Sequence, residues 1–167
     1  MLTDLVQIGR LGRKKREENL RFRAYLKDHR HSDRRLERFA AEIEAEIDCT
    51  VCANCCRVTE IGIKERDIEK LAKFVGVTRA EFLRDYSMRA ADGELILKRD
   101  ENGCVFLKGN LCSVYEARPQ NCAKFPHLVR GDGSIASRMW AFVDRAGYCP
   151  IVYNWMEKVK DDMGFRR

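Results

Sequence analysis

Cysteine is the residue type in this chain whose number and spacing could do chemistry. Four of the eight cysteines fall within eight positions, in the stretch CTVCANCC: Cys49, Cys52, Cys55 and Cys56. Gaps of two residues let a tight turn direct successive thiolates at one point, and such sulfur ligands suit zinc and iron–sulfur clusters alike. The other four are spread along the later chain: Cys104, Cys112, Cys122 and Cys149.

An even number of cysteines also fits a disulfide framework, which is typical of small secreted chains. The N-terminal sequence differs from a secretory signal because Asp4, Gln7 and Arg10 interrupt its apolar residues, and its basic run comes after them. We therefore expect a cytoplasmic protein with reduced thiols. A disulfide between adjacent Cys55 and Cys56 would also be strained. These features favour metal over disulfides.

The cysteine spacing matches no common cysteine motif over its whole length. The first three cysteines resemble the start of a bacterial ferredoxin run, but the fourth comes immediately after the third. A zinc ribbon needs a second two-residue pair, and a thioredoxin-like site needs one such pair beside a βαβ unit. The metal is therefore either zinc or an iron–sulfur cluster. We expect the late cysteines to complete the site, since four sulfurs on one tight loop close a shell poorly.

Other residues near the cysteines have predicted roles that are mainly structural. His127 could act as a ligand, although a histidine after Phe125-Pro126 is more typical of an exposed loop. We expect Arg118 to brace its turn through its planar set of donors. Tyr115 and Phe125 are expected to form core around the site.

Helices and hairpins must position these residues. Apolar residues at three- and four-residue steps predict a helix over 32–48 that leads directly to Cys49. Within 59–76, a short apolar lead-in is followed by a predicted second helix that Gly76 can end, and Thr78 with Glu81 forms a capping box for a third. The stretch 94–115 predicts a small β-hairpin or meander. A second hairpin is predicted around 131–133, and a final helix after 149–150.

The net charge of +6 comes from the first 38 residues, because the remaining chain carries equal numbers of acidic and basic residues. We therefore predict a basic helical extension over 1–45 and a cysteine-cluster metal-binding domain over 46–167. The expected fold class is α+β and mainly helical, a small metal-centred domain with a short β-hairpin. The basic run 13–16 predicts a solvated helical face, or a contact with an acidic protein or nucleic acid. No apolar run approaches the roughly 20 residues that span a membrane.

Several stretches together resemble a known family. CTVCANCC, then IKERDIEKLAKFVG, then GCVFLKGNLCSVYEARPQNCAKFP and a late Cys-Pro are similar to the YkgJ-like cysteine-cluster family, CxxCxxCC, a zinc- or iron-chelating domain, over about residues 46–150. The resemblance implies that all eight cysteines are the shared set. Two positions depart from the family pattern: Ala123 stands where arginine is frequent, and Ala53-Asn54 replaces a glycine-containing gap.

The sequence thus predicts a metal-binding protein whose clustered cysteines chelate zinc or an iron–sulfur cluster. Flagellin lysine methylase is a relative with a similar cysteine set, so one alternative is a metal-dependent enzyme that modifies protein side chains. Another is an adaptor with a structural metal whose basic helix binds an acidic partner or nucleic acid. An open coordination position would favour the enzyme, and a closed four-sulfur site would favour a structural metal.

Overall fold

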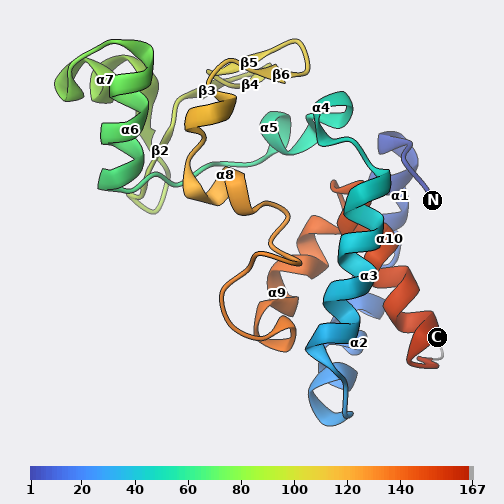
Figure 1. The fold of residues 1–167 in the computed structure, drawn as a ribbon. Helices are drawn as coiled ribbons and strands as arrows, with labels where there is room; N and C mark the ends of the chain where they lie inside the picture. The colour runs from blue at the N-terminus through green and yellow to red at the C-terminus, as the bar shows by residue number, and fades with distance from the viewer. Residues whose placement is uncertain (166–167) are drawn as a thin grey trace. The chain divides into compact units, whose positions relative to one another are not determined.

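The computed structural model describes residues 1–165, which divide into two compact units (Figure 1). Unit 1 combines Met1–Asp48 with the chain from Phe125 onward, and unit 2 is Cys49–Lys124. Helices dominate and the strands are short, so the predicted α+β, mainly helical class is confirmed. Within residues 1–165, no helix combines the length and the apolar character needed to cross a membrane.

Unit 1 is a helical bundle. Its helices are α1 (Leu5–Lys14), α2 (Arg16–Asp28), α3 (Asp33–Glu46), α9 (Ile135–Arg145) and α10 (Pro150–Asp162). Helix α10 packs against α3, α9 and α1, while α2 packs against α9. The predicted helix before the cysteine cluster is confirmed as α3. Its apolar face is buried, and the Trp155 indole donates a 2.9 Å hydrogen bond to the Leu36 carbonyl.

The N-terminal helices belong to the core of unit 1. Phe22 and Leu26 of α2 are fully buried, and Gly12 of α1 lies directly against Gly147. A Cβ at Gly12 would come within 2.4 Å of the Gly147 Cα, so only glycine permits this approach. Whether residues 1–45 and 46–167 fold independently of each other stays a prediction.

The predicted second hairpin around 131–133 is wrong. Ser134 caps a helix there, α9, by accepting a hydrogen bond from the Ser137 amide. The reason lies in the residue spacing after the glycines: Ile135, Met139 and Phe142 recur at helical steps and are all fully buried. Tertiary burial of that face fixes the helix.

Unit 2 is built from short elements. Its helices are α4 (Cys49–Cys52), α5 (Asn54–Val58), α6 (Glu65–Val75), α7 (Arg79–Tyr86), the 3-10 turn η1 (Tyr115–Ala117) and α8 (Gln120–Lys124). Its strands are β1 (Ser87–Arg89), β2 (Leu95–Leu97), β3 (Arg99–Asp100), β4 (Gly103–Cys104), β5 (Leu107–Lys108) and β6 (Leu111–Cys112). The strands form three antiparallel pairs, β1–β2, β3–β4 and β5–β6. Of the predicted hairpin or meander over 94–115, the hairpin is confirmed, because β3–β4 and β5–β6 are separate two-stranded sheets.

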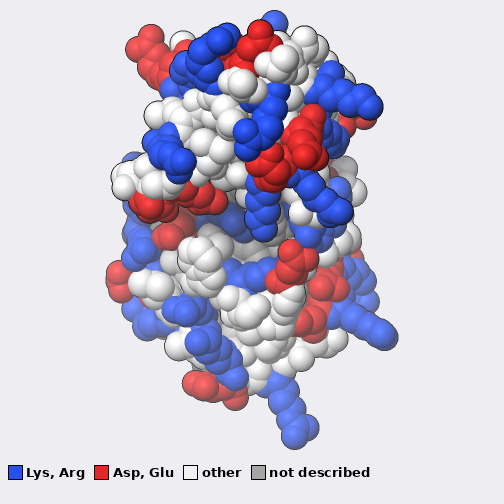
Figure 2. All heavy atoms as spheres, turned by 90° about the vertical axis from the view of Figure 1, so that its left-hand side faces the viewer, with Lys and Arg blue, Asp and Glu red and all other residues white. Residues whose placement is uncertain are grey.

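The α6–α7 hairpin carries the core of unit 2. Gly76 ends α6 in the left-handed conformation, and Thr78 with Glu81 forms the predicted capping box. Phe82 is fully buried and stacks near Tyr86 and Phe106. Basic and acidic side chains are interspersed over the face drawn in Figure 2. That face offers no broad area of one charge.

Candidate metal centre

Every predicted ligand except Cys149 lies in unit 2. The first cysteine stretch forms two short helices, α4 and α5, joined at Ala53. Ala53 is buried and has left-handed backbone angles, φ 46° and ψ 13°, which cost an L-residue about 1–2 kcal/mol. This position belongs to the gap in which the family pattern often has glycine. The left-handed bend gives that preference a physical reason.

The late cysteines of unit 2 lie on strands and on a short helix. Cys104 ends β4 and Cys112 ends β6, while Cys122 is in α8. Burial raises the pKa of Cys104 and of Cys112, and a backbone amide two residues further on lowers it in each case. These amides belong to Phe106 and Val114. Both amides point at sulfur, which is the arrangement that stabilises a thiolate.

Four thiols of unit 2 act on one another electrostatically. Burial, together with the neighbouring charges of Cys56, Cys104 and Cys112, raises the pKa of Cys122 to about 12. Cys56 also raises the pKa of Cys104 and of Cys112. The fold thus brings Cys56 from the first cluster together with three late cysteines. We call Cys56, Cys104, Cys112 and Cys122 the thiol quartet.

Cys56 has the opposite pKa shift from the rest of the thiol quartet. A hydrogen bond with Cys55, together with the nearby guanidinium groups of Arg57 and Arg118, lowers the pKa of Cys56 to about 7 against the effect of burial. Cys56 is therefore the member of the quartet that most readily exists as thiolate. Thiolate is the form that binds metal.

Side chains from the hairpins hold the first cysteine loop in place. Arg57 donates to the Cys52 carbonyl at 3.1 Å and to the Gly109 carbonyl at 3.0 Å, and it also contacts the Asn110 side chain. Asn110 in turn donates to the Val51 carbonyl at 2.8 Å. The loop is thereby tied to the β5–β6 turn on both sides of Cys52.

The β3–β4 hairpin, which carries Cys104, lies directly against the first cysteine loop. Arg99 donates to the Arg57 carbonyl at 2.8 Å. Gly103 has φ +115°, and a Cβ there would come within 2.6 Å of the Cys56 carbonyl oxygen. Because only glycine fits both conditions, Gly103 sets Cys104 beside Cys56.

Helix α8 is anchored on the side of α6. The Gln120 amide donates to the Asp67 carboxylate at 2.9 Å, and the Asn121 side chain donates to the Gly62 carbonyl at 3.0 Å. These bonds fix the helix that carries Cys122.

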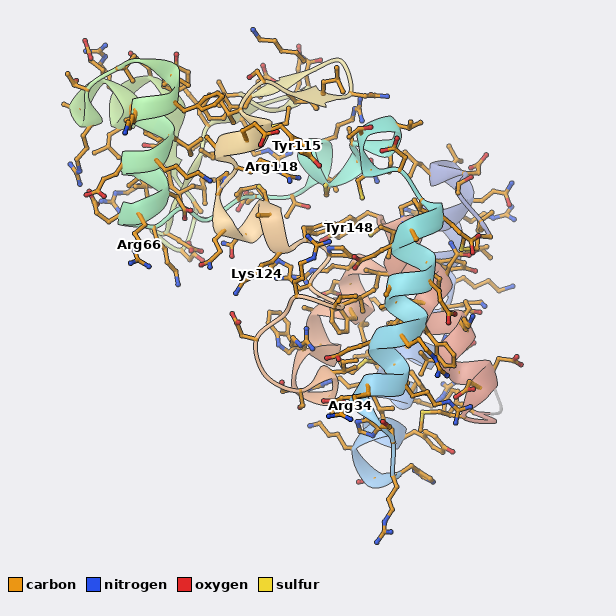
Figure 3. All side chains as sticks on the ribbon, in the orientation of Figure 1. Arg34, Arg66, Tyr115, Arg118, Lys124 and Tyr148 are labelled. Carbon is orange, nitrogen blue, oxygen red and sulfur yellow. The ribbon has the colours of Figure 1, made fainter. Side chains whose placement is uncertain are left out.

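Arg118 and Tyr115 lie together before α8 (Figure 3). Arg118 donates to the Tyr115 carbonyl at 2.9 Å, and its guanidinium is 3.5 Å from the centre of the Tyr115 ring. The predicted bracing role of Arg118 is confirmed. The expected burial of Tyr115 is wrong, because its residue is 45% exposed. The ring covers a cation at the surface instead of filling core.

Cys149 and His127 belong to unit 1. Cys149 is buried in the apolar core of that unit, at the start of α10, and His127 is in a loop with φ 67°. A role for either residue as a ligand stays a prediction. Phe125 was expected to form core around the metal site. It is partly buried and packs on the core of unit 1.

The donor chemistry of the thiol quartet fits a metal held by thiolates. In the described residues, however, no three His, Cys, Asp or Glu side chains are already grouped closely enough to hold a metal ion. The quartet members are electrostatic neighbours rather than a closed shell. Cys52 and all four quartet members are thiols outside any disulfide.

Comparison with known families agrees with this arrangement. Residues 48–150 match the family described as "CxxCxxCC: Putative zinc- or iron-chelating domain". The match covers more than half of the chain, so the chain belongs to this family, and the resemblance to the YkgJ-like cysteine-cluster family is confirmed. The family description thus supports metal binding in general. No curated protein and no solved structure matches the chain.

Proposed function

We propose that this protein binds zinc or an iron–sulfur cluster through its clustered cysteines, and that the thiol quartet is the core of the site. The observation that carries the proposal is the match of residues 48–150 to a zinc- or iron-chelating family, and the close approach of Gly103 to the Cys56 carbonyl supports a site shared by early and late cysteines. Four thiolates are the complete ligand set of a structural zinc site and of a cubane cluster.

The quartet side chains have distinct tasks in this proposal. Cys56, with its lowered pKa, provides the first thiolate. Cys104 and Cys112 accept backbone amide hydrogen bonds, so their negative charge stays stabilised after they lose a proton. Burial raises the pKa of Cys122, so a bound metal would be needed to hold it as a thiolate. A bound metal would supply the positive charge that offsets four neighbouring thiolates.

The other four cysteines are also proposed ligands, enough for a second four-sulfur site or for spare sulfurs beside the first. Cys49, Cys52 and Cys55 share the first loop with Cys56, and Cys149 is the predicted eighth ligand. Thiol alkylation of the reduced protein, with and without a chelator, tests each of them. Protection of Cys149 that a chelator removes supports its role as a ligand. Alkylation that is equal in both conditions, or protection that remains after chelation, removes Cys149 from the set.

The metal is identified by purifying the protein without oxygen and measuring iron, zinc and acid-labile sulfide. A brown protein with labile sulfide contains an iron–sulfur cluster, and a colourless one with zinc contains a mononuclear or small zinc site. A protein that retains neither metal nor sulfide, even after reconstitution with each, would contradict the proposal.

A substitution pair then tests the quartet itself. Cys56→Ser should abolish metal retention, because it removes the thiolate that forms most readily. Val51→Ser is the matched control: it introduces the same residue on the same loop, at a position that is 70% exposed and has no thiol. Unchanged metal content in Cys56→Ser would place the site elsewhere.

The two alternative functions stay predictions, as does the cytoplasmic location. Part of the basic run already has partners inside unit 1: Lys15 pairs with Glu157, and Arg16 lies 3.2 Å from Asp144. An acidic protein or nucleic acid would compete with these carboxylates.

A further inference from the structure

Three arginine side chains lie beside the cysteines of unit 2. Arg57 donates a hydrogen bond to the Cys52 carbonyl at 3.1 Å. Arg99 donates to the carbonyls of Arg57 and Val58, at 2.8 and 3.4 Å. Arg118, just before α8, donates through Nε to a carbonyl of its own turn at 2.9 Å. All these acceptors are uncharged, so the hydrogen bonds hold the three guanidinium groups without neutralising them. We call Arg57, Arg99 and Arg118 the arginine trio.

The arginine trio has no carboxylate to balance its charge. Within residues 1–165, none of its members forms an ion pair. Other arginines of unit 2 do form such pairs. Arg79 pairs with Glu65, at the exposed ends of α7 and α6. Arg84 pairs with its neighbour Asp85. Uncompensated positive charge is therefore concentrated where the thiol quartet lies.

The charge of the arginine trio acts on the quartet. Burial raises the pKa of Cys104, and the charge of Arg99 is one of the influences that oppose this rise. Burial likewise raises the pKa of Cys122, and the charge of Arg118 opposes it. Arg118 also acts on Cys56 of α5. In Figure 3, Arg118 lies on the side of η1 toward α5, in agreement with this influence.

A metal site made of four thiolates has a surplus of negative charge. A divalent zinc ion offsets only two of four thiolate charges, and a cubane cluster with four thiolate ligands is an anion as well. All members of the thiol quartet are partly buried. Charge removed from water in this way is costly unless an opposite charge lies beside it. The arginine trio provides that opposite charge at a fixed place.

We propose that Arg57, Arg99 and Arg118 are the counter-charge of the metal–thiolate site, and that they strengthen metal binding without being ligands. The inference rests on the proposed function of the thiol quartet. Arginine suits this role because its guanidinium keeps its charge at every physiological pH. Residues outside the ligand set that stabilise a metal site typically change metal affinity by about 10–100-fold.

Arg118 is the member of the trio on which charge can be tested with the least disturbance. Its only side-chain hydrogen bond within residues 1–165 goes to the Tyr115 carbonyl, so its replacement leaves the ties of the cysteine loop in place. Arg118→Gln removes the charge. Arg118→Lys keeps the charge but removes the planar group that stacks on the Tyr115 ring. Arg66→Gln is the matched control, because Arg66 is exposed on α6 of the same unit and lies away from Arg118 (Figure 3).

The measurement uses the full-length, reduced protein loaded with zinc, from which a chromophoric chelator removes the metal in the absence of oxygen. Arg118→Gln should raise the Kd for zinc about tenfold or more. Arg118→Lys and Arg66→Gln should each stay within about threefold of the wild type. If the wild type holds an iron–sulfur cluster instead, the reduction potential is compared. Arg118→Gln should lower that potential, because the reduced cluster is the more negative form and has lost a neighbouring positive charge.

The outcomes separate this inference from the proposed function. A wild type that binds metal as tightly as Arg118→Gln, or a cluster with the same potential in both, would overturn the counter-charge role and leave the proposed function intact. Arg118→Lys with the same defect as Arg118→Gln would assign the effect to the stacked group and not to its charge. An equal defect in Arg66→Gln would assign it to the overall charge of unit 2. A wild type that holds neither zinc nor a cluster would overturn both proposals.

Discussion

In unit 1, long helices bury Phe22, Phe142 and Trp155 completely, whereas the short elements of unit 2 bury half as many apolar side chains. Unit 2, with roughly 70–80 residues, has a size at which a single apolar core rarely supplies enough stability. The two units also differ in their polar groups. Unit 1 buries a cluster of ion pairs, and unit 2 places its thiols beside arginine and asparagine side chains that bind backbone carbonyls.

This difference indicates two ways to hold a chain together. The core of unit 1 is sufficient by itself, since its helices interlock through apolar side chains. Unit 2 brings together the first cysteine loop, two very short hairpins and α8 around a smaller apolar core. Thiolate bonds to a metal would join these segments directly. We therefore expect the stability of unit 2, and not that of unit 1, to depend on metal.

The largest expected effect is that of metal removal. Chelation under reducing conditions should cost unit 2 several kcal/mol or more, because metal binding and folding are coupled in small thiolate sites. Hydrogen exchange should become fast in residues 49–124 and stay slow in α3, α9 and α10. Adding the metal back should restore protection. An equal loss of hydrogen-exchange protection in both units would contradict the prediction that only unit 2 depends on metal.

The next effect concerns the buried ions of unit 1. Lys160 has a side chain that is only 6% exposed, and it lies 2.6 Å from Glu18 and 2.9 Å from Glu157. Lys160→Met leaves both carboxylates without this partner and should cost about 3–5 kcal/mol. Lys158→Met is the control, because Lys158 is 44% exposed and its pair with Glu42 is worth about 0–1 kcal/mol.

Urea unfolding followed by tryptophan fluorescence measures both variants. Both tryptophans of the chain, Trp140 and Trp155, lie in unit 1, so the signal reports this unit. Similar midpoints for the two variants would show that the buried lysine contributes no more than a surface one. Metal content should be unchanged in each.

Much of this comparison could be predicted from the sequence. The apolar faces of α3 and α6, the capping box at Thr78 and the β-rich stretch before Tyr115 are local patterns, and each is confirmed. The hairpin prediction near residue 131 is wrong because Gly131 and Gly133 indicate a turn but carry no information about the helix after it. The burial of Met139 and Phe142 makes that segment a helix.

The sequence singles out the candidate ligands of the site but not the side chains that support them. Cysteine spacing singles out the sulfurs directly, whereas Arg57, Arg99 and Asn110 act by hydrogen bonds to carbonyls that are distant in the sequence. Nothing in their local sequence indicates those partners. Gly103 did carry a signal, since an Asn-Gly pair predicts a turn. Its contact with Cys56 depends on tertiary structure alone.

A smaller effect tests how tightly unit 2 is built around its cysteines. Gly103→Ala combines an unfavourable φ of +115° with a Cβ that would be 2.6 Å from the Cys56 carbonyl oxygen, and it should cost about 2–3 kcal/mol. Gly109→Ala is the control: its φ is +62°, but no atom lies within 4 Å of the added Cβ. It should cost about 1 kcal/mol.

Metal affinity gives a second comparison between the two glycine variants. Competition with a chromophoric chelator should show weaker metal binding in Gly103→Ala and nearly normal binding in Gly109→Ala. If both variants bind metal equally well, the approach of β4 to Cys56 does not shape the site.

The smallest effect is a pH dependence confined to unit 1. Burial raises the pKa of Glu157, but hydrogen bonds from Lys15 and Lys160 outweigh it and hold the pKa below its ordinary value of 4.5. The folded state therefore favours the ionised carboxylate. Its contribution to stability is present above the unfolded pKa and is lost as the pH falls through the lower, folded one. Glu157→Gln should thus flatten the loss of stability in acid.

Glu44, also in unit 1, has a pKa shift opposite in sign to that of Glu157. Burial raises its pKa above 4.5 although Arg130, 3.7 Å away, acts against this. The folded state therefore favours the protonated acid, and its contribution is present at low pH and lost as the pH rises through the raised pKa. Glu44→Gln should make unit 1 more stable near neutral pH and steepen its loss on acidification. Tryptophan fluorescence in urea at a series of pH values follows both variants without interference from thiol protonation in unit 2. Curves that shift in the same direction for the two substitutions would contradict the assigned signs.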